Sequence, residues 1–83
     1  MTDFAELVGR NLGRGRESRG LSKGELARRM GVDRRVITRW ESGAHVPQRA
    51  NLQRLALILN VPLSYFLSDG DELGASDGDE PGV

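Results

Sequence analysis

Apolar residues recur at intervals of three and four along most of the chain. They fall into four groups and a short final one: Phe4, Leu7, Val8 and Leu12; Leu26, Ala27 and Met30; Val36, Ile37 and Trp40; Leu52, Leu55, Ala56 and Leu59; Val61, Leu63, Phe66 and Leu67. This spacing gives each segment one apolar stripe when it is helical. No segment alternates apolar and polar residues as a half-buried strand does. The pattern therefore predicts an all-α domain.

Capping residues between these groups predict where the helices begin and end. Ser22 and Glu25 have the spacing of a capping box, and Asp33 is a good N-cap. Gly31 and Gly43 suit the left-handed conformation that ends many helices. We expect five short helices near residues 3–18, 22–30, 33–41, 48–59 and 62–67.

The first of these helices has an unfavourable composition. Gly13 and Gly15 lie in its interior, and each costs about 1 kcal/mol relative to alanine. We therefore expect a frayed or bent end. The glycine spacing matches neither the dinucleotide fingerprint nor the P-loop, and no predicted strand precedes it, so a nucleotide loop is not expected.

Eighty-three residues allow one small domain, and several classes of protein are disfavoured. The chain has no cysteine and only one histidine, so we expect apolar packing to hold the domain, without a metal or cofactor. It offers no nucleophile–base pair, so an enzyme is not expected. No apolar run approaches the roughly 20 residues of a membrane span. The N-terminus lacks the order of a signal peptide, which favours the cytoplasm.

The formal net charge of zero conceals two regions of opposite charge. Residues 1–67 hold all 12 basic residues and six acidic ones, a net charge of +6. Residues 68–83 hold the other six acids and no base. Their Gly, Asp, Glu and Ser content predicts disorder. We therefore expect a folded basic domain over 1–67 and a flexible acidic tail over 68–83.

The predicted helix 33–41 divides into two arcs at 100° per residue. One arc is apolar and contains Val36, Ile37 and Trp40, and the other contains Arg34, Arg35, Thr38 and Arg39. The second arc has no acid to balance its arginines. Two of them lie in the first turn, where the helix dipole disfavours cations. We interpret the arc as an anion-binding surface, with an ordinary solvated face as the alternative.

The segments GLSKGELARRMGVDRRVITRWESG and NLQRLALILNVPLSYFL, with Pro47 between them, resemble the lambda-repressor-like (Cro/cI or XRE-type) helix-turn-helix family. The resemblance covers about residues 4–67 and implies a compact five-helix DNA-binding domain. It also implies a sequence-specific transcriptional regulator, for which a repressor is the leading expectation. Such a regulator is expected to act as a homodimer on a near-palindromic operator in double-stranded DNA. The alternative is a protein-binding module, such as an antitoxin of a toxin–antitoxin pair.

The resemblance also assigns roles to individual residues. It implies base contacts from Arg34, Arg35, Thr38 and Arg39 on the recognition helix. It implies phosphate contacts from Ser22, Lys23, Trp40, His45, Gln48 and Arg49. An ion pair between Arg16 and Glu41 is expected from some relatives. Candidates for the dimer interface are Leu63, Tyr65, Phe66 and Leu67, with closure of the core as their alternative role.

The sequence departs from the family pattern at three positions. Lys23 replaces a usual glutamine, Gly15 a usual apolar residue, and Gln48 a usual Ser or Thr cap. Longer relatives carry a second domain that cleaves itself, forms oligomers or is a zinc peptidase, and this chain shows neither HExxH nor a Ser/Lys dyad for one. We expect either a complete minimal regulator or a fragment that ends in a linker.

Overall fold

The computed structural model describes residues 3–68, and all of the regular secondary structure in this range is helical. The elements are α1 (Phe4–Ser18), α2 (Lys23–Met30), α3 (Arg34–Ser42), α4 (Arg49–Leu59) and the 3-10 helix η1 (Leu63–Leu67). The predicted all-α fold and its five elements are confirmed. The last element is a 3-10 helix because five residues between Pro62 and Ser68 allow few α-helical hydrogen bonds. The predicted disorder of the acidic tail lies outside the described residues, except at Ser68.

The predicted helix caps are present. Ser22 Oγ accepts a hydrogen bond from Glu25 N at 3.0 Å, and Glu25 Oε1 accepts one from Ser22 N at 2.8 Å. Asp33 Oδ1 accepts from Arg35 N at 2.8 Å at the start of α3. Gly31 and Gly43 end α2 and α3 with φ values of 75° and 86°. These ends leave only a short turn between α2 and α3.

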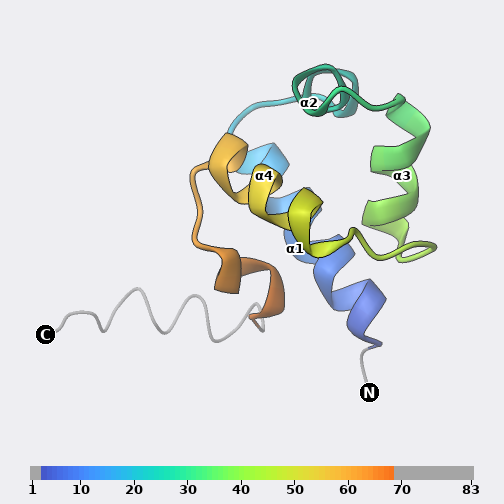
Figure 1. Ribbon diagram of the computed structural model, residues 1–83, viewed down its shortest axis with the longest axis vertical. Helices are drawn as coiled ribbons and strands as arrows, with labels where there is room; N and C mark the ends of the chain where they lie inside the picture. The colour runs from blue at the N-terminus through green and yellow to red at the C-terminus, as the bar shows by residue number, and fades with distance from the viewer. Residues whose placement is uncertain (1–2, 69–83) are drawn as a thin grey trace, which may run out of the picture.

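The helices α2 and α3 cross steeply at one side of the molecule (Figure 1), where α2 is seen nearly end-on and α3 lies in the plane of the view. The remaining helices supply the surface on which this pair packs. The fully or almost fully buried apolar side chains come from all five elements: Val8, Leu12, Leu26, Ala27, Met30, Ile37, Trp40, Leu55, Ala56, Leu59 and Phe66. One continuous core therefore fixes the position of α3.

The helix α1 continues through Gly13 and Gly15 to Ser18, so the expected fraying was wrong. The reason is close packing. A Cβ at Gly15 would lie 3.2 Å from Leu59 Cδ1, and a Cβ at Gly13 would lie 3.4 Å from Glu41 Oε1. At Gly9 a Cβ would lie only 2.4 Å from the backbone oxygen of Trp40. Contacts with α3, α4 and η1 thus offset the low helix propensity of glycine.

A buried amide fastens the last element to the first helix. Asn11 is 1% exposed, and its Nδ2 donates to Phe66 O at 2.9 Å and to Ser68 O at 2.7 Å. Both donors of this amide are therefore satisfied, as a buried polar group requires. Within residues 3–68, no helix has the length and apolar character to cross a bilayer.

Candidate nucleic-acid interface

The two arcs of α3 have opposite environments. Ile37 and Trp40 are buried and Val36 is half-buried. The polar arc is exposed along its whole length and consists of Arg34, Arg35, Thr38 and Arg39. Core packing on one side thus directs three guanidinium groups and one hydroxyl into solvent on the other.

One acid does accompany the exposed arginines, which the sequence interpretation missed. Arg35 Nε lies 3.3 Å from Asp33 Oδ1, with the two side chains 79% and 57% exposed. Hydrogen bonds from the backbone and then the side chain of Arg35 lower the pKa of the Asp33 carboxyl. Asp33 was expected only as a helix cap. The signal in the sequence is an aspartate at the N-cap with an arginine two residues later.

The candidate phosphate contacts come from three segments: the start of α2, the loop after α3 and the start of α4. Ser22 is exposed and Lys23 half-buried at the start of α2, while Gln48 and Arg49 are exposed at the start of α4. His45 is exposed in the loop after α3, and its backbone N donates to Arg39 O at 3.2 Å. That hydrogen bond holds the loop against the C-terminal part of α3.

Two aromatic residues, for which the helical spacing and the family resemblance implied different roles, lie in the core. Trp40 is 6% exposed, so its side chain is not available for the expected phosphate contact. Phe66 is fully buried and closes the core, which was its alternative role, and its side chain offers no exposed area to a second copy. Both aromatic side chains belong to the buried core, and their large apolar area favours burial.

The other interface candidates differ in exposure. Leu67 is 50% exposed, whereas Leu63 and Tyr65 are partly buried against the core. Sequence reasoning missed Leu57, which is 82% exposed on α4. The helical spacing that marks Leu55, Ala56 and Leu59 as core leaves Leu57 on the opposite side of its helix, and this could have revealed it.

The structure brings Arg16 and Glu41 together. Arg16 Nε lies 2.6 Å from Glu41 Oε2, and Arg16 Nη2 lies 3.1 Å from Glu41 Oε1. Arg16 Nη1 also donates to Leu21 O at 2.9 Å. The two side chains are only 11% and 12% exposed, and the hydrogen bonds that Arg16 donates to Glu41 raise the pKa of the Arg16 guanidinium. This bidentate ion pair, together with the hydrogen bond to Leu21 O, joins α1, the loop before α2 and the end of α3.

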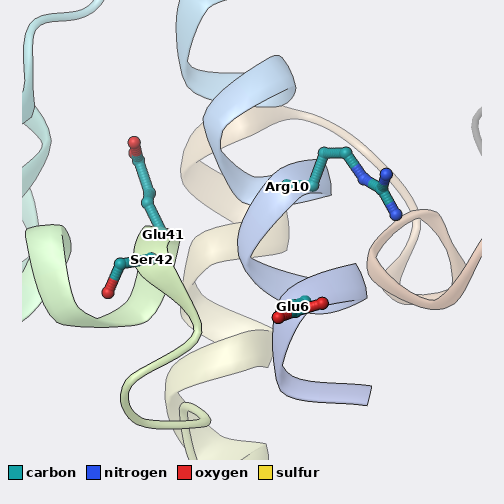
Figure 2. Close-up of a pocket in the computed structure, with 4 residues that line it drawn as sticks. All are labelled: Glu6, Arg10, Glu41 and Ser42. Atoms are coloured by element: carbon teal, nitrogen blue, oxygen red, sulfur yellow. The ribbon is translucent and has the colours of Figure 1, made fainter. Parts of the chain in front are cut away.

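A small hollow lies between α1 and the C-terminal end of α3. Its volume is about 290 Å³, and its lining residues are Glu6, Arg10, Glu41 and Ser42. Figure 2 shows Arg10 pointing away from Glu41 and Ser42. The hollow is at the opposite end of α3 from Arg34 and Arg35. None of its four lining residues belongs to the exposed arc of α3.

A family model described as helix-turn-helix matches residues 12–66, which contain α2, the turn and α3. The chain belongs to the helix-turn-helix family. The matched residues form a DNA-binding domain of the type found in transcriptional regulators.

Similar proteins bear names that agree with this family. A Methanocella arvoryzae protein named as an HTH-type transcriptional regulatory protein is 39% identical over 61 residues, which are 74% of this chain and 18% of that protein. The hypothetical transcription factor NHTF from Neisseria has a TM-score of 0.81 at 26% identity, over 88% of this chain and 84% of that one. The restriction-modification controller protein C.AhdI from Aeromonas hydrophila has a TM-score of 0.70 at 27% identity, over 75% and 94%. This chain thus spans less than a fifth of the archaeal relative.

Proposed function

We propose that the chain is a sequence-specific transcriptional repressor that reads the major groove of double-stranded DNA with the exposed arc of α3. The observation that carries the proposal is the division of α3 into a buried side and a side with three exposed arginines and Thr38. A helix presented this way fits the major groove, and the first residues of a recognition helix contact base edges.

The chemistry of the exposed arc favours guanine. An arginine guanidinium donates two parallel hydrogen bonds to guanine O6 and N7. Lys23, Gln48 and Arg49 lie at helix starts. Phosphate oxygens can also accept hydrogen bonds from the free backbone N–H groups there. The net charge of +6 over residues 1–67 adds attraction to any duplex. The proposed role is binding without catalysis, in the cytoplasm where the target DNA lies.

The most direct test is selection of bound sites from random duplex DNA. We expect an enriched site whose half-sites contain guanine and form an inverted repeat, because two copies of one domain related by twofold symmetry read the same sequence on opposite strands. Enrichment of no sequence by a chain that is helical in solution would contradict the proposal. Tight binding to a protein partner without DNA selectivity would favour the protein-binding alternative.

We further propose a homodimer, and the exposed apolar side chains support it. Leu57 and Leu67 are 82% and 50% exposed. Covering such side chains with a second copy would remove apolar area from water, which favours association. Sedimentation at micromolar concentration should give a dimer, weakened by Leu57→Glu and little affected by Ser18→Glu, an exposed position on α1. A monomer that binds singly to an unrepeated site would contradict the homodimer.

A further inference from the structure

We infer that Asp33 positions the side chain of Arg35 for one guanine and so sets base preference without itself contacting the base. This inference rests on the proposed function, because it assigns the orientation of a proposed base-reading residue. Asp33 would be a positioning residue, and Arg35 the residue that touches the DNA.

The geometry begins with a carboxylate that the helix end holds in place. Asp33 Oδ1 accepts from the backbone N of Arg35 at 2.8 Å, as an N-cap does. The same oxygen lies 3.3 Å from Nε of the Arg35 side chain. The carboxylate is therefore anchored by the backbone of the residue whose side chain it holds.

The contact engages Nε of the Arg35 guanidinium and leaves its two Nη groups available. Within residues 3–68, the two Nη groups of Arg35 make no hydrogen bond and no ion pair, whereas Nε is engaged by Asp33. A guanidinium is planar, so fixing Nε restricts the plane in which both Nη groups lie. The Nη groups carry the parallel N–H donors that match guanine O6 and N7.

Holding this side chain before binding has a consequence for selectivity. Arg35 is 79% exposed, and a long exposed side chain loses rotamer freedom when it binds. Because the contact with Asp33 already restricts the Arg35 rotamers in the free protein, less rotamer freedom is lost on binding. The contact also disfavours Arg35 orientations that reach a phosphate. No such acid contacts the Arg34 or Arg39 side chain in the described part of the chain. Arg35 should therefore be the most base-selective of the three arginines.

The test separates the cap of α3 from the contact with the Arg35 side chain. Serine also caps helices, but it is shorter and uncharged, so Asp33→Ser keeps the cap and removes the hold on Nε. Binding would be measured for the wild type, Asp33→Ser, Arg35→Ala and the double variant. The DNAs are the selected site, the same site with each G·C pair changed in turn to A·T, and a random duplex. Thermal melting would confirm that α3 remains folded.

We expect Asp33→Ser to reduce the preference for guanine at one position by about threefold to tenfold, a part of what a bidentate contact supplies. Affinity for random duplex should stay equal or rise, because a negative charge is lost. In the Arg35→Ala background, Asp33→Ser should change no base preference. Unchanged preference in Asp33→Ser would overturn the inference, as would an equal loss with and without Arg35.

Failure of the inference can be distinguished from failure of the proposed function. If the wild type selects no site, the proposed function fails and the inference fails with it. If the wild type selects a site and Arg35→Ala loses one guanine, while Asp33→Ser matches the wild type, only the inference fails.

Discussion

Arg35 and Lys23 carry the same charge, but their positions predict different losses when each is replaced. Arg35 is on the exposed arc of α3, and Lys23 is at the start of α2. Arg35→Ala should cost about 1–3 kcal/mol on the selected site and much less on random DNA. Lys23→Ala should weaken both complexes alike and reduce the slope of log affinity against log salt by about one. Titrations at several salt concentrations measure both quantities, and equal losses on both DNAs for both variants would refute this division.

The pair of Arg16 and Glu41 predicts a loss of stability at two residues that are not among the candidate DNA contacts. Glu41→Ala would leave a guanidinium that is only 11% exposed without its carboxylate, which should cost about 3 kcal/mol. Glu17 is the matched control, because its carboxylate is 73% exposed and lies 3.8 Å from Arg16 Nη2. Glu17→Ala should change the free energy of unfolding by less than about 0.5 kcal/mol. Urea unfolding measures both values, and similar losses for both variants would contradict a structural role for the pair.

The elements themselves were largely predictable because their signals are local. A capping box, two left-handed glycines and a 3.6-residue apolar period act over a few neighbouring residues, and each is readable in the sequence. The glycines of α1 were misjudged for the complementary reason. The role of Gly13 and Gly15 depends on side chains far along the chain, such as Glu41 near Gly13 and Leu59 near Gly15. Helix propensity describes an isolated helix and contains no information on such contacts.

The close approach of α1 and α3 at Gly9 predicts an effect of a single methyl group. Gly9→Ala would place a Cβ 2.4 Å from Trp40 O and 2.6 Å from Glu41 O, so α3 must shift. Overpacking of this kind typically costs 1–3 kcal/mol, on the order of what we expect here. Gly24→Ala is the control, because its Cβ would meet only Ser22 Oγ, at 3.9 Å, and should add about 0.5–1 kcal/mol of stability. Melting temperatures that rise for both variants would show that the approach is looser than described.

At the scale of the whole molecule, the candidate site was only partly predictable. The exposed arc of α3 follows from a helical wheel, and the residues around it follow from the family resemblance. Helical spacing also places Trp40 on the buried side of α3 and Leu57 on the exposed side of α4, whereas the burial of Phe66 depends on how the five elements pack together. The spacing of an N-cap aspartate two residues before an arginine allows the contact of Asp33 with Arg35, but the contact also depends on one side-chain rotamer, which the spacing does not determine.

The acidic tail predicts a salt-dependent competition with DNA. Its six acids equal the excess positive charge of residues 1–67, and Asn11 holds its first residue, Ser68, against α1. A tethered acidic segment has a high local concentration near the basic surface. A chain that ends at Ser68 should bind random duplex more tightly than the full chain at low salt, with a gap that narrows as screening increases. Equal affinities at low ionic strength would instead support a solubilising tail or a linker.

The proposed function depends on base reading by α3 in the major groove, and one substitution in the DNA tests this directly. Replacing guanine by 7-deazaguanine in the selected site keeps base pairing and the minor groove but removes the N7 acceptor in the major groove. We predict a loss of about 1–3 kcal/mol of binding free energy at one or more guanines for the wild type. Arg35→Ala should show no further loss at the guanine that Arg35 reads. Full wild-type affinity with 7-deazaguanine at every guanine would contradict the central claim.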